Sequence, residues 1–123
     1  MITGIGLDMI EVARVSDKIS RSVDFRNEIF SAREIAYCEA QPAAAEHYAA
    51  RFAAKEAFLK ACGVGLTLGY RLSEIEIIHG TDGRPELLAG GAWKELTFDK
   101  TIHVSITHLK TIASAVVILE KAL

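Results

Sequence analysis

Two carboxylates occupy positions where acidic side chains are unusual. Asp8 directly follows the apolar run 2–7, and Glu56 lies at the edge of the apolar stripe of an alanine-rich segment. Carboxylates are rarely buried unless they are paired or bound to a cation. Because Mg²⁺ typically takes one or two carboxylates together with phosphates and water, Asp8 and Glu56 are candidate metal ligands. A turn role for Asp8, and an ion pair of Glu56 with Lys55 or Lys60, are the structural alternatives.

A lysine and two glycines form a second candidate group. Lys60 lies one helical turn after Glu56 and shortly before Gly63 and Gly65. An ammonium beside a glycine-rich bend with exposed amides could bind a phosphate group. The glycines follow a helix rather than open one, so they do not form a P-loop, and Gly63 taken alone is more typical of a helix cap.

Polar residues alternate with apolar ones near the C-terminus. His103, Ser105 and Thr107 share one face of a predicted strand, and His108 comes just beyond them. A solvated sheet face would explain His103. A serine hydrolase would need a nucleophile elbow of the type Gly-x-Ser-x-Gly, which the sequence lacks.

The size and composition predict one compact domain that spans residues 1–123. A chain of 123 residues is close to the commonest domain size, and half of it is hydrophobic. With 24% charged residues and only two prolines, the composition excludes intrinsic disorder.

The charge balance limits the classes of partner. Fourteen Lys and Arg against 16 Asp and Glu give a net charge of −2, so we expect no nucleic-acid partner. No apolar run reaches the roughly 18 residues of a membrane span, and no charged secretory n-region opens the chain. We therefore expect no membrane association and a cytoplasmic location. Cys38 and Cys62 lack metal-site spacing and are expected to be reduced thiols.

The hydrophobic periodicity predicts the elements that position these residues. We expect an α+β fold, a small single domain with a mostly antiparallel sheet and a long central helix. The predicted elements are a strand over 2–8, helices over 11–23, 31–39 and 43–62, a hairpin over 73–88, a short helix over 89–96, and a hairpin of strands 101–107 and 112–119.

Three blocks of sequence together point to a known family. They are residues 4–11 (GIGLDMIE), 51–61 (RFAAKEAFLKA) and 103–108 (HVSITH). In order, length and spacing, the chain resembles bacterial holo-acyl-carrier-protein synthase, the short class of phosphopantetheinyl transferase. This resemblance implies transfer of phosphopantetheine from coenzyme A to a serine of apo-acyl carrier protein, releasing adenosine 3′,5′-bisphosphate and supporting fatty acid biosynthesis. It also implies a trimer-forming fold, with sites at the subunit interfaces of a homotrimer.

The resemblance also implies roles for individual residues. Asp8 and Glu56 match the Mg²⁺ ligands of the family, and Lys60 matches the basic residue near the pyrophosphate; these three are the expected catalytic residues. Contacts with coenzyme A are expected from Lys60 and from the residues Gly63, Gly65, Ser105 and His108. The family commonly has Gly-Thr-Gly after the helix, whereas Val64 stands between the glycines here, which removes a hydroxyl contact.

The predicted helix 11–23 carries an apolar and a basic stripe. Arg14, Lys18 and Arg21 lie nearly opposite its apolar residues, and their simplest role is that of a solvated face. In the resembled family this helix docks the acidic carrier protein, so we expect these three residues and Arg26 to form the docking surface.

Two other functions remain as alternatives. One is a Mg²⁺-dependent hydrolase of coenzyme A or nucleotide pyrophosphates, and the other is a non-catalytic binding module of the same fold. A non-catalytic module would be expected to lack the metal carboxylates, and both are present.

Overall fold

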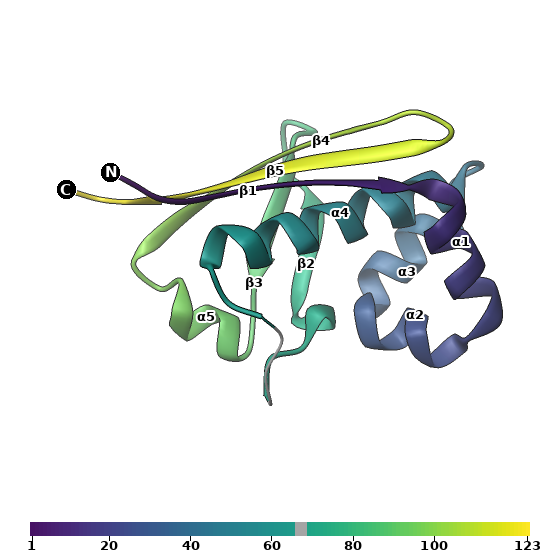
Figure 1. Cartoon of the computed structure of the whole chain (residues 1–123), viewed down its shortest axis with the longest axis horizontal. Coiled ribbons are helices and arrows are strands. Elements are labelled where there is room, and N and C mark those ends of the chain that lie inside the picture. Colours follow the sequence, from purple (N-terminus) through teal and green to yellow (C-terminus); the bar gives the residue numbers. More distant parts are fainter. Residues whose placement is uncertain (66–68) are drawn as a thin grey trace.

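A three-stranded antiparallel sheet forms one layer of the fold (Figure 1). The computed structural model describes residues 1–65 and 69–123. Strands β1 (Ile2–Glu11) and β4 (Lys100–His108) both pair with the central strand β5 (Ile112–Lys121). The Met1 ammonium donates to the Lys121 carbonyl oxygen at 2.9 Å, so the two termini lie together at one end of the sheet.

The long helix α4 (Ala44–Cys62) covers one face of this sheet. Its contact with β1 is so close that a Cβ on Gly6 would overlap the Ala57 carbonyl oxygen. A Cβ on Gly4 would overlap the Ala61 carbonyl oxygen in the same way. The glycines of β1 therefore let the strand lie directly against the helix backbone, as expected for glycine at a close approach.

The remaining elements surround α4. Figure 1 shows α1–α3 at one end of the molecule, α5 at the other, and a separate β2–β3 hairpin alongside α4. Their bounds are α1 Val12–Arg21, α2 Val23–Ile29, α3 Ala32–Glu39, the 3₁₀ helix η1 Leu72–Glu74, β2 Ile75–His79, β3 Pro85–Ala89 and α5 Ala92–Leu96.

Two apolar clusters pack against α4. One gathers around Phe58 and Trp93 between α4, the β2–β3 hairpin and α5, and the other around Phe30 and Tyr48 beside α1–α3. In each pair the aromatic rings meet edge to face, at centroid distances of 5.5 and 4.9 Å. Since α4 contributes to both clusters, it is the central element of the core.

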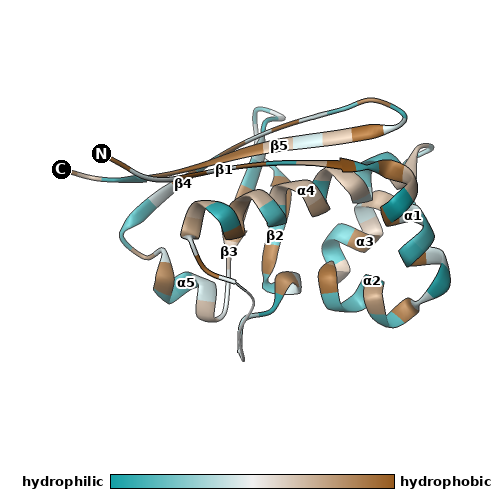
Figure 2. Ribbon diagram, viewed as in Figure 1, coloured by the Kyte–Doolittle hydropathy of each residue, from teal (hydrophilic) through white to brown (hydrophobic). Residues whose placement is uncertain are grey.

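The opposite face of β1 is not covered. Ile5, Leu7 and Met9 are 64%, 63% and 68% exposed, although they alternate with residues that face α4. Figure 2 shows hydrophobic residues along both β1 and β5, which pair with each other. Continuous exposed apolar surface of this kind marks an interaction site.

Three predicted boundaries are wrong. Asp8 does not end its strand, because β1 keeps pairing with β5 as far as Glu11 and Ile112. The helix predicted over 11–23 divides at Ser22, where the backbone is extended. The Ser22 side-chain oxygen accepts from the Phe25 amide and so caps a second helix, α2, which was not predicted. The short helix predicted from residue 89 begins at Ala92, since Ala89 still belongs to β3.

The other main predictions of secondary structure and fold class are confirmed. Helix α4, both hairpins, the helix predicted over 31–39 and the α+β class are present. Ser31 and Glu34 form a capping box at the start of α3. Both cysteines are free thiols, and burial raises the pKa of Cys38 and of Cys62 to about 11. Among the described residues, no helix has the length and apolarity that crossing a membrane requires.

Replacing Gly6 with alanine should destabilise the protein by about 1–3 kcal/mol, because the new methyl group would push β1 away from α4. Chemical denaturation monitored by circular dichroism measures this change. Gly65→Ala is the matched control, since no atom lies within 4 Å of its added Cβ. Equal stability of Gly6→Ala and wild type would show that the close approach imposes no constraint.

Candidate functional site

A cleft of about 490 Å³ opens where the end of β1 meets α1 and α4. Asp8 from β1 and Glu56 from α4 line it, together with the basic side chains Arg14 and Lys18 of α1. The cleft therefore combines two carboxylates with cationic groups from a neighbouring element. The structure brings together Asp8 and Glu56, the metal ligands predicted from the sequence.

Lys60 connects the helix to the strand beside this cleft. Its ammonium donates to the Leu7 carbonyl oxygen at 2.9 Å and to Asp8 Oδ1 at 3.2 Å. The Lys60 side chain is 56% exposed, so the pair with Asp8 contributes little to stability. Its position leaves a positive charge facing solvent next to the two carboxylates.

The alternative interpretation of Glu56, an ion pair with Lys55 or Lys60, is wrong. Lys60 pairs with Asp8, and Lys55 pairs with the buried Glu34. Within residues 1–65 and 69–123, Glu56 takes part in no ion pair. This carboxylate is consequently available to a ligand that enters the cleft.

Partial burial raises the pKa of Glu56, and the negative charge of Asp8 raises it further. Lys60 and Lys18 act in the opposite direction on the same carboxyl group. Two carboxylates that repel each other in one cleft have the electrostatics of a cation site.

The donor set fits Mg²⁺. Asp8 and Glu56 supply hard oxygen ligands, and the cleft leaves room for water and phosphate oxygens to complete an octahedron. The described residues hold no cluster of three or more His, Cys, Asp or Glu side chains that could bind a metal. In a two-carboxylate site of this kind, the remaining ligands are oxygen atoms of water or of a bound molecule.

The predicted glycine residues lie at the C-terminal end of α4, and neither is among the residues that line the cleft. Gly63 caps the helix with a φ of 71°, and its amide donates to Leu59 and Lys60 carbonyl oxygens. Gly65 follows, and a Cβ added there would meet no atom within 4 Å apart from its chain neighbours. The helix-cap role of Gly63 is confirmed.

Ser105 and His108 lie on the exposed edge of β4, away from the residues of the first cleft. Ser105 lines a second cleft of about 350 Å³ with Arg84 and His103, and His103 contacts Glu120 at 3.0 Å. His108 Nδ1 lies 2.9 Å from Glu46 on α4. Within one chain, Ser105 and His108 are thus separate from Asp8 and Glu56.

The structure adds residues around His108 that the sequence reasoning missed. The His47 ring lies 5.4 Å from that of His108, and burial lowers the pKa of His47, as do His108 and Arg51. Arg51 is buried, stacks 4.4 Å from the Tyr37 ring, and has no hydrogen-bond partner for Nε within the described part of the chain. The available signal was the spacing of His47 and Arg51, one helical turn apart.

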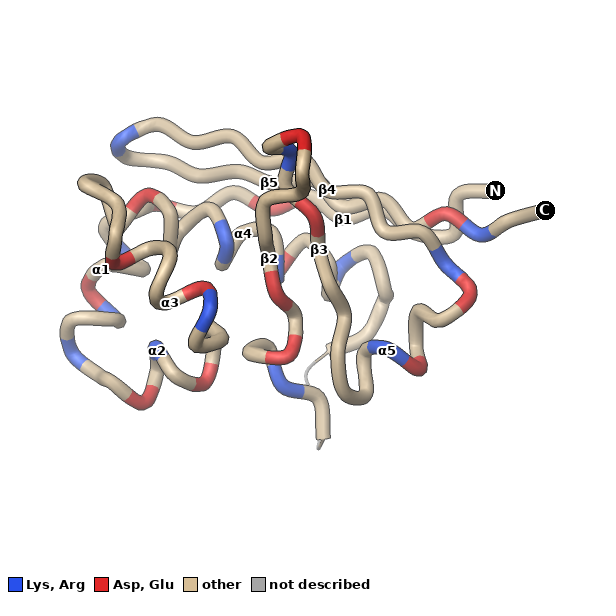
Figure 3. The backbone as a smooth tube through the Cα atoms, turned by 180° about the vertical axis from the view of Figure 1, so that it is seen from behind, with Lys and Arg blue, Asp and Glu red and all other residues tan. Residues whose placement is uncertain are grey.

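The basic stripe of the first helix is confirmed as a surface feature. Arg14, Lys18 and Arg21 are exposed on α1, and Figure 3 shows charged residues of both signs at this end of the molecule. Arg26 differs from them, because it lies on α2, only partly exposed and 3.7 Å from Glu39. The structure therefore does not place Arg26 in the stripe.

Comparison with known proteins gives one consistent result. The model of the 4′-phosphopantetheinyl transferase superfamily matches residues 4–118. Holo-[acyl-carrier-protein] synthase of Syntrophus aciditrophicus (strain SB) is 40% identical over 124 residues, covering 98% of this chain and 97% of that protein.

Two solved structures have the same fold. The holo-(acyl-carrier-protein) synthase of Bacillus anthracis str. Ames, in complex with CoA (3′,5′-ADP), aligns with a TM-score of 0.83 and 32% identity over 99% of each chain. That of Neisseria meningitidis aligns with a TM-score of 0.87 and 30% identity, over 98% of this chain and 100% of the other. The protein belongs to the 4′-phosphopantetheinyl transferase superfamily.

Proposed function

We propose that this protein is a holo-[acyl-carrier-protein] synthase, which transfers phosphopantetheine from coenzyme A to a serine of apo-acyl carrier protein. The products are holo-acyl carrier protein and adenosine 3′,5′-bisphosphate, and the reaction serves fatty acid biosynthesis in the cytoplasm. The whole chain acts as one catalytic domain. The observation that carries the proposal is the cleft that joins Asp8 and Glu56 beside the basic side chains of α1.

In the proposed reaction the serine oxygen bonds to the phosphorus next to the pantetheine, and the pyrophosphate P–O bond breaks. The serine proton is released, and the bisphosphate leaves with the electrons of the broken bond. Such a transfer needs positioning and charge neutralisation rather than a covalent protein intermediate.

Two carboxylates that line the cleft and one lysine beside it have roles in this scheme. Asp8 and Glu56 would hold Mg²⁺, which when bound neutralises charge on the phosphate oxygens. Lys60, anchored on the Leu7 carbonyl oxygen, offsets the charge that develops on the leaving bisphosphate. Together these groups stabilise the transition state more than the ground state.

Coenzyme A would also contact residues outside the first cleft. We assign the nucleotide half to Ser105 and His108 on β4, and the phosphates to the backbone amides around Gly63 and Gly65. These residues are apart from Asp8 and Glu56 in one chain, which supports a site completed by a second subunit. The apolar face of β1 offers the surface for that association.

Asp8→Asn and Glu56→Gln should each lower phosphopantetheine transfer at least 100-fold while leaving the fold intact, because a neutral amide is a poor ligand for Mg²⁺. Mass spectrometry of apo-acyl carrier protein incubated with coenzyme A and Mg²⁺ measures the transfer. Circular dichroism gives the control for folding.

Three results of this assay would contradict the proposals. Wild type without transfer activity would overturn the function. Release of adenosine 3′,5′-bisphosphate without carrier protein would indicate a hydrolase instead. Near-normal activity of Asp8→Asn or Glu56→Gln would remove that residue from the metal site.

The exposed β1 face supports a homotrimer. Ile5→Lys should convert the trimer to monomers of 13.4 kDa, because Ile5 belongs to the exposed apolar face of β1 and pairs with Ile118 of β5. Size-exclusion chromatography with light scattering measures the mass. Phe98→Lys is the matched control, since Phe98 is 83% exposed but lies outside the sheet. A trimer that survives Ile5→Lys would place the interface elsewhere.

The basic stripe of α1 supports docking of an acidic carrier protein. We propose that Arg14 and Arg21 make the principal ion pairs, while Lys18 and Arg26 contribute to steering. Arg14 lines the cleft, so a carrier protein held there presents its serine to the proposed metal site. The already paired Arg26 adds only long-range attraction.

Reversing Arg14 and Arg21 to Glu should raise the apparent KM for carrier protein about tenfold or more at low salt, with an unchanged KM for coenzyme A. The difference from wild type should shrink as salt is added, because exposed charges are screened beyond about 8 Å at physiological ionic strength. Steady-state kinetics at two salt concentrations measure both effects. Replacing Lys94 and Lys121 with Glu is the control, because it changes the net charge by the same amount. If this control raises the KM for carrier protein as strongly, net charge rather than α1 governs docking.

A further inference from the structure

The sheet-facing side of α4 lacks features that would fix its position. Ala53 and Ala57 are fully buried there, and the opposing strand presents Gly4 and Gly6. Small side chains allow a close approach, but they form few ridges that could pack into grooves of the opposing strand. The rotation of α4 and its position along its axis must therefore be fixed largely by other contacts.

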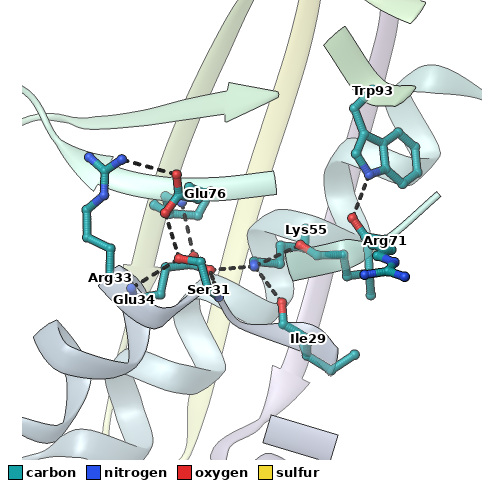
Figure 4. A network of polar contacts seen from close by, with 10 residues as sticks. Ile29, Ser31, Arg33, Glu34, Lys55, Arg71, Glu76 and Trp93 are labelled. Atoms are coloured by element: carbon teal, nitrogen blue, oxygen red, sulfur yellow. Dashed lines mark hydrogen bonds and ion pairs between the residues drawn. The ribbon is translucent and has the colours of Figure 1, made fainter. Parts of the chain in front are cut away.

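A buried lysine lies on the other side of the same helix. Lys55 is two residues from both Ala53 and Ala57, which puts it roughly opposite them at about 100° per residue. Its side chain is 0% exposed. The ammonium donates to the carbonyl oxygen of Ile29 at 2.6 Å, to Glu34 Oε1 at 2.6 Å and to the carbonyl oxygen of Leu72 at 3.0 Å (Figure 4).

The partner of this lysine is itself held in place. Glu34 is 1% exposed, and its Oε1 also accepts from the Ser31 amide in the capping box. Its other oxygen, Oε2, accepts from the Ile77 amide of β2 at 3.0 Å. The pair therefore connects α4 to α2, α3, η1 and β2 by directional bonds, as Figure 4 shows.

Stability alone does not account for this arrangement. Burial lowers the pKa of Lys55, and the charge and hydrogen bond of Glu34 oppose that shift. The positive charge of Lys55 is therefore stabilised by the groups that accept its hydrogen bonds. Apolar residues of similar volume often replace a buried ion pair without loss of stability. Apolar residues would not penalise a displaced α4 in the same way. Any displacement that separates the Lys55 ammonium from its three acceptors leaves a buried charge unpaired, which costs free energy.

Lys55 directly precedes Glu56, and Lys60 follows within about one and a half turns. A slip of α4 by one residue would move Glu56 about 1.5 Å along the axis and turn it about 100° away from Asp8. Misplacement by about 1 Å can cost a reaction roughly 100-fold in rate. The two functional side chains of α4 thus depend on the setting of this helix.

We propose that Lys55, held by Glu34, is a positioning residue that sets the rotation and axial position of α4 and so places Glu56 and Lys60 opposite Asp8. This inference rests on the proposed function, in which Asp8 and Glu56 hold the metal. Lys55 itself contacts neither substrate nor metal, since it is enclosed between α4, α2, α3 and η1.

The double variant Lys55→Met/Glu34→Gln tests the proposal without leaving an unpaired buried charge. The glutamine introduced by Glu34→Gln keeps one oxygen for the Ser31 or Ile77 amide, and the methionine introduced by Lys55→Met retains the volume of the lysine chain. We expect a folded protein whose kcat falls at least tenfold and whose affinity for Mn²⁺, a paramagnetic substitute for Mg²⁺ measured by electron paramagnetic resonance, falls several-fold.

Leu87→Ala is the matched control, because it lowers stability in the core of β3 outside the hydrogen-bond network. At equal fractions folded, it should keep the kcat and the Mn²⁺ affinity of the wild type. If the double variant behaves like this control, Lys55 and Glu34 serve stability only and the proposal is overturned. Should the double variant not fold, Glu34→Asp takes its place, because it keeps both charges but shortens the side chain that holds Lys55. This variant must then lower both the kcat and the Mn²⁺ affinity.

The two readouts separate this proposal from the proposed function. Binding of Mn²⁺ requires neither carrier protein nor coenzyme A, so it reports on the metal site even without transfer. Absence of transfer by the wild type, with a Mn²⁺ affinity that still falls in the double variant, would overturn the function alone. Transfer by the wild type, with both quantities unchanged in the variant, would overturn the positioning role alone.

Discussion

The contact between the backbone of α4 and the glycines of β1 is the constraint on which the rest of the structure depends. Gly4 and Gly6 leave no side chain between strand and helix, so Asp8, two residues further along β1, comes beside Glu56 on α4. Larger residues would separate these elements and widen the distance between the two carboxylates. The absence of side chains thus sets how closely β1 and α4 approach at the candidate metal site, whereas the proposed Lys55 anchor sets the rotation and axial position of α4.

The polar groups that stabilise the fold and those that would act on a ligand lie on different sides of α4. Lys55 and Glu34 are fully enclosed and mutually paired, whereas Glu56 is partly exposed and unpaired among the described residues. A buried charge is stabilised by a partner that is held rigidly beside it. An unpaired carboxylate in a cleft is stabilised only when a cation binds to it. Helix α4 therefore carries both a buried, fully paired lysine, Lys55, and a carboxylate without an ion-pair partner among the described residues, Glu56.

Much of this arrangement could be predicted from the sequence, because its signals are local. The alanine-rich run ending at Gly63 identifies α4, and the alternation around Ser105 identifies β4. The break at Ser22 was missed because the apolar spacing continues through it, and only the cap bond to the Phe25 amide shows a new helix. The Lys55–Glu34 pair and the proximity of His47 to His108 join segments far apart in the chain, and no spacing rule reports such contacts.

The strict alternation of β1 has a consequence for which changes in chain length the protein can tolerate. Gly4, Gly6 and Asp8 face α4, while Ile5 and Leu7 point to the uncovered side of the sheet. From Gly4 onward the pairing with β5 is regular, so inserting or deleting one residue between Gly4 and Asp8 would exchange the two faces for the residues that follow. The acid would then turn outward, and bulky side chains would be forced against the helix. Substitutions can accumulate on either face separately. A change in length would damage both faces at once, so β1 should be among the least tolerant segments to insertion and deletion.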